Sequence, residues 1–470
     1  MGPVLIVADR VVIKQILVKD FHLFRNRGGG GSGGGPGSIH PILSKSIFVA
    51  RDDQWRQIRT IFSPTFTAAK LRHMYGLMDR CSADLIGHLD NSLLTTAATA
   101  DGTVTVAALD LRQAMDSYTM DVIARCAFGI QSDVYRPDNQ LTSSANQTFA
   151  AIPLRPIGQS SRPIVSIVGN CRRQQQQQQP PPPPVNVSHF FIQLSRDFIS
   201  KRLNREVGAG TDGQPLIFND FLQLMIDSST DNDSNGQQLN NSTGRLTENE
   251  ILGQCYVFFI AGYDALVSAL AYCLNELAVR PELQDRLYDE ISRLFADTDN
   301  ESTIDYNDLK RLEFMDAVLK ETLRHYPPVI NLEREARQDV TLTDSTGSTG
   351  SIVIANGTQL EIPVYAIHHD RDYYPEPDLF EPNRFMPTSS GGQWPPIESY
   401  TYMPFGLGPR NCLGTRLAVQ SAKLALVKLV RRYRFSPVAD TQWPPEFISG
   451  ASRRFQLQAD RLIVGIHKRG

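Results

Sequence analysis

Apolar residues recur at helical spacing over most of the chain, and this pattern predicts a largely helical protein. Thr247 and Glu250 form a capping-box pattern, which predicts that a long helix begins there and runs through Leu274. Another helix surrounds Glu321, and Asp9 can cap a short one near the start of the chain. The remaining predicted helices cover Leu71–Leu89, Ala114–Phe128, Phe190–Leu203 and Phe218–Ile226.

Strand-like segments are few and short. Residues 3–7 form one apolar run, and residues 339–363 alternate strand-like pieces with Gly, Ser and Asn turns. The second region predicts one small sheet late in the chain. Many helices with a minor sheet indicate a mainly α protein, an α-rich α+β fold, and not a series of βαβ units.

Two low-complexity segments interrupt the pattern. Residues 28–38 are nearly all glycine, and residues 172–184 are rich in glutamine and proline. No shift in composition divides the rest of the 470 residues. We therefore expect a single domain over residues 1–470 with two insertions in surface loops.

Composition and charge exclude several classes of protein. The net charge is −3 and aromatic residues do not alternate with basic runs, so nucleic-acid binding is not expected. Six scattered cysteines show no zinc-ligand spacing and indicate a reducing compartment. The stretch Cys255–Leu274 is long enough to span a membrane but has Asp264 at its middle, so we expect a buried core helix. The chain opens without an anchor-like segment.

The most informative segment is Phe405–Gly414, where Cys412 lies in a glycine-rich loop directly before a helical pattern. The unpaired N–H groups at a helix start favour a thiolate, so Cys412 is a candidate metal ligand. Gly406, Gly408 and Gly414 are expected to let the backbone pass close to a flat ligand, and Arg410 can pair with a carboxylate at the rim of that ligand. A buried haem fits these features.

The pattern Phe-x-x-Gly-x-Arg-x-Cys-x-Gly, which begins at Phe405, resembles the haem-binding signature of the cytochrome P450 superfamily. The resemblance is greatest from residue 246 to residue 434 and is closest to the microsomal members that handle drugs, toxins and steroids. The central helix also has features of the thromboxane-synthase-like isomerases. The resemblance implies the P450 fold without its N-terminal anchor and first strands, and haem b held by the Cys412 thiolate.

Other matching residues carry roles that the resemblance implies. Trp55 and Arg59, one helical turn apart, would both donate hydrogen bonds to a haem propionate. Arg334 and Arg27 resemble further propionate contacts. Three residues would form a buried structural network under the haem: Glu321, Arg324 and Arg384.

The stretch Ala261–Leu266 resembles the oxygen-binding helix of the family, with one departure. Alanine, Ala265, stands where a threonine usually follows the acid, and it has no hydroxyl to help deliver protons. Asp264 is then a possible proton relay, with Ser268 one turn on; alternatively, Asp264 is an interior acid satisfied by a neighbouring base. Some family members without the threonine rearrange peroxides, and others still oxygenate substrates.

The resemblance also implies substrates and partners. Five residues match substrate-lining positions and predict an apolar pocket for a lipophilic small molecule: Phe48, Ala261, Ala265, Val329 and Ile330. A basic cluster could receive an acidic electron-transfer partner: Lys423, Lys428, Arg431, Arg432 and Arg434. We expect a monooxygenase at the cytosolic face of the endoplasmic reticulum membrane, supplied with electrons from NADPH by a reductase. A reductase-independent peroxide isomerase or dehydratase, and a non-catalytic or defective haem-binding protein, remain alternatives.

Overall fold

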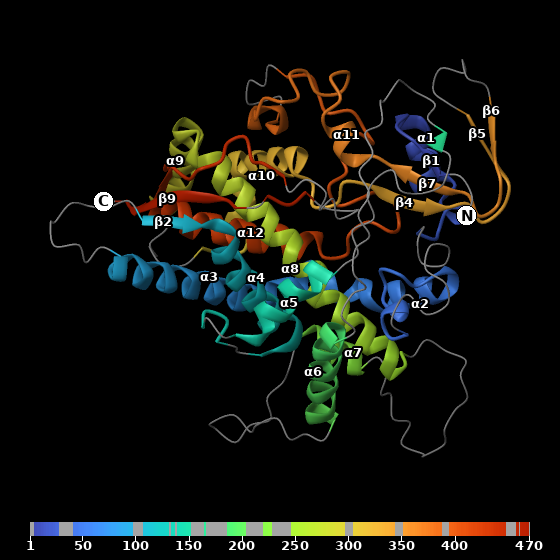
Figure 1. Cartoon of the computed structure of the whole chain (residues 1–470), viewed down its shortest axis with the longest axis horizontal. Helices are drawn as coiled ribbons and strands as arrows, with labels where there is room; N and C mark the ends of the chain where they lie inside the picture. The colour runs from blue at the N-terminus through green and yellow to red at the C-terminus, as the bar shows by residue number, and fades with distance from the viewer. Residues whose placement is uncertain are drawn as a thin grey trace.

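The longest helix, α8 (Glu248–Ala278), crosses the centre of the molecule, and the other helices pack around it (Figure 1). It begins as the sequence predicts. The Glu250 N–H donates a hydrogen bond to the Thr247 hydroxyl, and the Thr247 N–H donates one to the Glu250 carboxylate at 2.9 Å. Among the described residues, α8 alone is long and apolar enough to span a membrane, but 67% of its most apolar window is buried inside the protein. It is the core helix that the sequence predicts.

The computed structural model describes fourteen segments of the chain, and both predicted insertions, 28–38 and 172–184, lie outside them. The segments are residues 4–27, 41–96, 107–130, 133–136, 139–151, 164–165, 186–203, 220–227, 246–296, 304–343, 351–387, 394–447, 457–459 and 461–469. Within them the architecture is the predicted one, mainly helical with small sheets.

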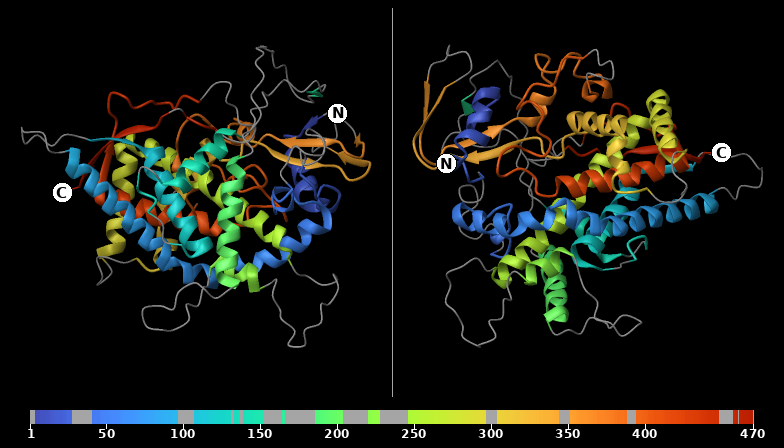
Figure 2. Two further views of the ribbon diagram at one scale, coloured as in Figure 1. Left: turned by 60° about the horizontal axis from the view of Figure 1, so that its bottom comes forward. Right: turned by 180° about the vertical axis from the view of Figure 1, so that it is seen from behind.

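The helices predicted from apolar spacing are all present in the described residues, most of them with longer bounds, whereas the described helix in the predicted Phe218–Ile226 segment covers Phe221–Asp227. α12 (Thr415–Arg432) packs against α3 (Ala68–Thr96), and Figure 2 shows the two side by side from behind. The other helices are α1 (Arg10–Lys14), α2 (Asp52–Phe62), α4 (Leu111–Phe128), α5 (Gln140–Ala151), α6 (Asn186–Leu203), α7 (Phe221–Asp227), α9 (Pro281–Ala296), α10 (Glu313–His325) and α11 (Val364–His368).

The strands of the described residues form three separate small sheets. One has the order β3 (Ile164–Val165), β1 (Val4–Ile6), β7 (Gln359–Ile362), β4 (Leu332–Glu335), and a second has the order β2 (Ala107–Asp110), β9 (Ile463–Lys468), β8 (Tyr433–Ser436). The third is the pair β5 (Val340–Thr343) and β6 (Ser351–Ile354). The prediction of one sheet from residues 339–363 is therefore wrong, because β7 pairs in parallel with β1, more than 350 residues away in sequence.

Two hydrophobic cores meet at the segment that carries the cysteine. The larger core surrounds α8, and the smaller one packs under the β1–β7–β4 sheet. Leu407 packs against the smaller core and Leu413 against the larger one. The loop between them is thus held from both sides.

The N-terminal helix contributes to that smaller core. The Asp9 carboxylate caps α1 by accepting hydrogen bonds from the N–H groups of Val11 and Val12, as predicted. After Lys14 the helix widens into a π-helical turn, Gln15–Lys19, whose Ile16 and Leu17 are fully buried. This turn brings a backbone carbonyl against the cysteine loop.

Candidate functional site

The loop Phe405–Gly414 is tied to itself by backbone hydrogen bonds directly before α12. The Cys412 N–H donates to the Phe405 carbonyl at 2.8 Å, and the Asn411 N–H donates to the Gly408 carbonyl at 3.0 Å. Gly406 and Gly408 have φ angles of 69° and 73°, in the left-handed region that favours glycine. The sequence correctly places Cys412 just before a helix start, and the two glycines form the turn that puts it there.

The expectation that all three glycines make room for a ligand needs correction. A Cβ on Gly408 would lie 1.8 Å from the carbonyl oxygen of Leu17, so this glycine makes room for the backbone of the π-helical turn. A Cβ on Gly406 would be 3.7 Å from the nearest atom, a Leu332 side-chain carbon, and one on Gly414 would have nothing within 4 Å. The close approach at Gly408 is between two parts of the protein.

Cys412 differs from the other described cysteines in its exposure. Its side chain is exposed, whereas Cys81, Cys126, Cys255 and Cys273 are buried. Even so, burial has the largest influence on the Cys412 thiol and raises its pKa, against the opposing effects of the Gly414 N–H and the Thr415 hydroxyl. The donors at the helix start favour the thiolate, as expected, but burial outweighs them and the net pKa shift is upward.

Three arginines from three distant segments gather beside Cys412: Arg27, Arg334 on β4 and Arg410. Arg27 donates to the carbonyl oxygens of Phe48 and Arg410, each at 3.4 Å. Burial lowers the pKa of Arg27 to about 10, although the Cys412 and Glu333 charges oppose this effect. Burial together with the neighbouring guanidinium charges lowers the pKa of Arg334 to about 9 and that of Arg410 to about 8.

Three donor atoms of this arginine cluster lack hydrogen-bond acceptors. The side-chain atoms Nε and Nη1 of Arg410 and Nε of Arg334 are buried and have no partner among the described residues. A buried charged donor without a partner is destabilising by at least about 1–3 kcal/mol. An anionic group beside Cys412 would satisfy these donors and offset the mutual repulsion of the guanidinium charges. The carboxylates of a haem fit this donor set.

Helix α2 brings Trp55 and Arg59 to the same place. The Arg410 guanidinium lies 4.6 Å from the centre of the buried Trp55 ring, within cation–π range. Arg59 donates to the Asn411 carbonyl at 2.9 Å and to its side-chain oxygen at 2.7 Å. Trp55 and Arg59 therefore both contact the cysteine loop.

The structure also brings Glu321, Arg324 and Arg384 together in the interior. Arg324 Nε lies 2.8 Å from the Glu321 carboxylate with both side chains fully buried, and Arg384 Nε lies 3.4 Å from the same carboxylate. Burial alone would raise the Glu321 pKa, but hydrogen bonds from Arg324 and His325 lower it to about 2. Glu321 is therefore a buried anion with two arginine partners.

His368 links this network to the cysteine loop and was missed from the sequence. Its Nδ1 lies 3.3 Å from the Arg324 carbonyl, and its Nε2 accepts a hydrogen bond from the Met403 N–H at 3.0 Å. Burial lowers the His368 pKa to about 3, so the ring is neutral and Nε2 is free to accept. No spacing signal identifies this residue, since its partners are 35 and 44 residues away.

Asp264 is paired with a neighbouring base, which is the alternative that the sequence left open. Arg112 on α4 lies 3.0 Å from its carboxylate and donates to the Ser268 hydroxyl at 3.4 Å. One turn along α4, Asp116 accepts a hydrogen bond from Asn146 at 3.3 Å. Arg112 and Asp116 were not singled out from the sequence, because their role depends on α4 packing against α8.

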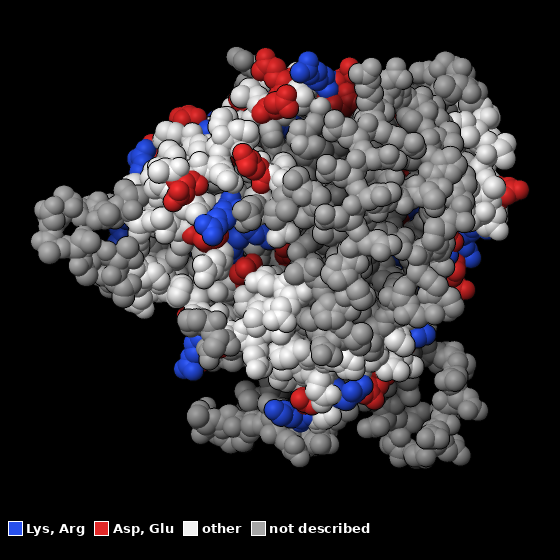
Figure 3. All heavy atoms as spheres, in the orientation of Figure 1, with Lys and Arg blue, Asp and Glu red and all other residues white. Residues whose placement is uncertain are grey.

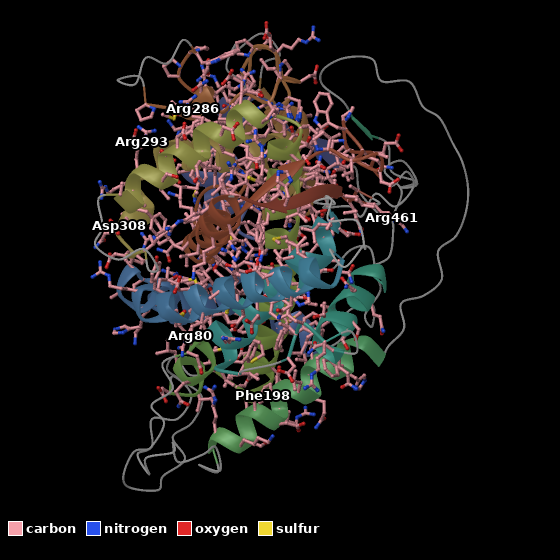
Figure 4. The ribbon with its side chains drawn as sticks, turned by 90° about the vertical axis from the view of Figure 1, so that its left-hand side faces the viewer. Arg80, Phe198, Arg286, Arg293, Asp308 and Arg461 are labelled. Atoms are coloured by element: carbon pink, nitrogen blue, oxygen red, sulfur yellow. The ribbon has the colours of Figure 1, made fainter. Side chains whose placement is uncertain are left out.

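The predicted substrate-lining residues are not part of the tightly packed core. On the otherwise buried α8, Ala261 is exposed and Ala265 half-buried, and Val329 and Ile330 are half-buried. Phe48 is 45% exposed and stacks on Arg27, with 4.2 Å between the guanidinium and the ring centre. A separate surface pocket of about 380 Å³ is lined by Phe198 of α6, labelled in Figure 4, and by none of these five residues.

The predicted basic cluster is not a free positive surface. Lys428, Arg432 and Arg434 are ion-paired with Asp79, Asp90 and Asp285 at 2.6–2.9 Å. Lys423 is buried against Asp316 at 2.7 Å, and Arg431 stacks on Phe295. Acids from α3, α9 and α10 pair with four of these five residues, and docking of an electron-transfer partner at the cluster stays a prediction. On the face of the molecule that Figure 3 shows, acidic and basic side chains of the described residues are interspersed.

Comparisons with known proteins give a consistent family. The sequence profile described as Cytochrome P450 matches residues 1–157 and 184–459. The chain is 32% identical over 464 residues to Cytochrome P450 3A11 of Mus musculus, and the aligned region covers 98% of this chain and 82% of that protein. It is 31% identical over 446 residues to Cytochrome P450 3A5 of Homo sapiens, covering 94% and 78%. It is 32% identical over 448 residues to Cytochrome P450 3A56 of Fundulus heteroclitus, covering 94% and 80%.

Proposed function

This chain belongs to the cytochrome P450 family of haem-thiolate monooxygenases, and we propose that Cys412 would hold a haem b through its thiolate, with Arg27, Arg334 and Arg410 as the residues that would bind the haem carboxylates. The observation that carries the proposal is the arginine cluster. Its unpaired buried donors face the same region as the only exposed thiol among the described cysteines.

Each residue of this site then has a role that its contacts support. When bound, the haem supplies dioxygen activation, and a thiolate ligand favours O–O cleavage. Coordination would deprotonate Cys412 in spite of its raised pKa, because a metal-bound thiol loses its proton. Phe405 and Asn411 hold the loop, Trp55 and Arg59 position Arg410 and Asn411, and Glu321, Arg324 and Arg384 stabilise the chain beneath the site.

The substrate that we propose is a lipophilic small molecule. Phe48, Ala261, Ala265, Val329 and Ile330 present apolar surface that is not fully packed, as a hydrophobic pocket requires. We further propose electron supply from NADPH through a reductase, association with the endoplasmic reticulum membrane, and a single catalytic domain over residues 1–470.

Asp264 is proposed as the proton-holding group near the substrate. Its carboxylate is paired with Arg112, which also contacts Ser268, so the two α8 side chains lie within reach of one base. Proton transfer from Asp264 would require it to exchange this ion pair for another partner. With alanine at position 265, Ser268 is the nearest serine or threonine hydroxyl along the helix.

The first experiment is the absorption spectrum of the reduced protein under carbon monoxide. We expect the red-shifted thiolate band in the wild type and its loss in Cys412→Ser. Arg410→Gln should lower the haem content, whereas Arg416→Gln, an exposed arginine two residues after the loop, should not. A wild-type protein without the thiolate band would refute the proposal.

The second experiment separates the reductase-dependent reaction from peroxide chemistry. Turnover of a lipophilic substrate with NADPH and reductase is compared with turnover of an organic hydroperoxide alone. A monooxygenase should require the reductase, and Ala265→Thr should couple more of its electrons to product. Hydroperoxide turnover without any reductase-dependent product would overturn the proposed electron supply.

A further inference from the structure

Asn26 lies at the centre of the segments that supply the arginine cluster. It is 2% exposed and directly precedes Arg27. Its side chain and Asp52 are joined by two reciprocal hydrogen bonds: Asn26 Nδ2 donates to Asp52 Oδ1 at 3.0 Å, and the Asp52 N–H donates to Asn26 Oδ1 at 2.9 Å. Both functional groups of the amide are therefore used on one partner residue.

The backbone of Asn26 makes a second connection, to β4. The Glu335 N–H donates to the Asn26 carbonyl at 2.9 Å, and the two residues form an isolated antiparallel bridge. Glu335 directly follows Arg334, so the bridge fixes the register between two of the arginines. One residue thus connects the Arg27 segment with both β4 and the start of α2.

The start of α2 has a backbone conformation that needs such support. Asp52 has a φ of 47°, and a non-glycine residue in this region persists only where its surroundings hold it. The next turns of α2 carry Trp55 and Arg59, and the carbonyl of Ala50, two residues earlier, accepts a hydrogen bond from Arg410. A change in the direction of this segment would move every α2 contact to the cysteine loop.

We propose that Asn26 is a positioning residue that holds Arg27, Arg334 and the α2 residues in register for the two haem carboxylates. The inference rests on the proposed haem site. It goes beyond that site because Asn26 itself contacts no ligand and acts only through Asp52, Glu335 and Arg27. Guanidinium groups that bind two carboxylates at once tolerate little displacement, since charge-assisted hydrogen bonds depend on both distance and direction.

A charge swap tests this role. In Asn26→Asp, a carboxylate replaces the amide that now binds Asp52. The two carboxylates repel each other, so the pair of reciprocal hydrogen bonds between residues 26 and 52 is broken. The double variant Asn26→Asp with Asp52→Asn restores a donor opposite a carboxylate, and asparagine tolerates the left-handed φ at position 52. Arg25→Gln, at the position next to Asn26, is the matched control. It removes only the ion pair between Arg25 and Asp53, whose side chain is 91% exposed.

The measurement is the rate at which the haem-loaded protein transfers haem to excess apomyoglobin. We expect transfer at least 10-fold faster for Asn26→Asp, within 3-fold of wild type for the double variant, and within 2-fold for Arg25→Gln. The haem reduction potential of Asn26→Asp should also fall, since less positive charge would face the propionates. A merely structural residue would change stability without this pattern of loss and rescue.

The outcomes separate the inference from the proposed function. A wild-type protein that shows no thiolate band fails the proposed function before any variant is compared. If the wild type shows the band but Asn26→Asp releases haem at the wild-type rate, or the folded double variant does not recover, the inference is wrong. Should Asn26→Asp not fold, Asn26→Ser, whose hydroxyl reaches one partner at a time, should release haem about 3–10-fold faster, and wild-type release would overturn the inference.

Discussion

Replacing Gly408 by alanine should separate the cysteine loop from the N-terminal π-helical turn. The added Cβ would lie 1.8 Å from the Leu17 carbonyl oxygen, whereas a carbon and a carbonyl oxygen in contact are about 3.3 Å apart. The two backbones must therefore move apart by about 1.5 Å. Neither side yields easily, because Leu17 is fully buried and Leu407 packs into the same core.

The expected loss of stability has two parts. The left-handed φ of 73° costs an alanine about 1–2 kcal/mol. Forcing extra volume between packed segments adds about 1–3 kcal/mol. Together they give about 2–5 kcal/mol, and the shifted loop should also lower the haem content.

Gly357→Ala is the matched control. Its φ is 79°, but a Cβ there would have nothing within 4 Å, so only the backbone strain applies. Guanidinium unfolding followed by circular dichroism, with the haem-to-protein ratio measured in parallel, compares the two variants. Equal losses of stability in Gly408→Ala and Gly357→Ala, or an unchanged haem content in the former, would refute the argument that loop and turn are in obligatory contact.

Three further changes test other parts of the structure. Glu321→Gln should lower the free energy of unfolding by about 3–5 kcal/mol, because Arg324 loses its buried counter-charge. The half-exposed pair of Arg432 offers a comparison, and Arg432→Gln should cost less than about 1 kcal/mol in the same urea titration. Burial, assisted by the negative charge of Asp264, raises the Asp116 pKa from 3.8 to about 6, against hydrogen bonds from Tyr263 and Asn146 and the positive charge of Arg112. The native state then holds this proton more tightly than the unfolded state, so the wild type should lose about 1–3 kcal/mol as the pH rises from about 4 to about 6. Asp116→Asn should lack this decline, and parallel unfolding profiles would contradict the reasoning. Gln254, fully buried on α8, binds the backbone of Lys45 and Ile47 at 2.7–2.8 Å. Gln254→Ala should cost about 2–3 kcal/mol and alter the ratio of 4-phenylimidazole to imidazole affinity measured by difference spectroscopy, while an unchanged ratio would show that the Phe48 segment does not depend on it.

The sequence was most informative where one local segment contains the whole signal. The capping box at Thr247 predicted the start of α8, and the residues around Cys412 predicted a loop that ends at a helix. Both depend on hydrogen bonds between residues only a few positions apart, which residue types and spacing specify. The predicted helices lie where apolar spacing placed them for the same reason.

Interactions between distant segments were not accessible in this way. The pairing of β7 with β1, the acids that neutralise α12, and the Arg112 partner of Asp264 all join residues more than 50 positions apart. A basic run reads the same in sequence whether its neighbours in space are acids or water. Only packing decides that, since it determines which side chains approach within a few ångströms.

The sequence by itself therefore determined a helical protein with a cysteine poised before a helix, and the types of residue that a haem would need. The tertiary structure decided that Arg27, Arg334 and Arg410 share one buried place with unpaired donors, and that Asn26 connects their segments. The physical reason is that periodicity and capping are short-range properties. Burial, charge and the pKa values that follow from them depend on neighbours supplied by the whole fold.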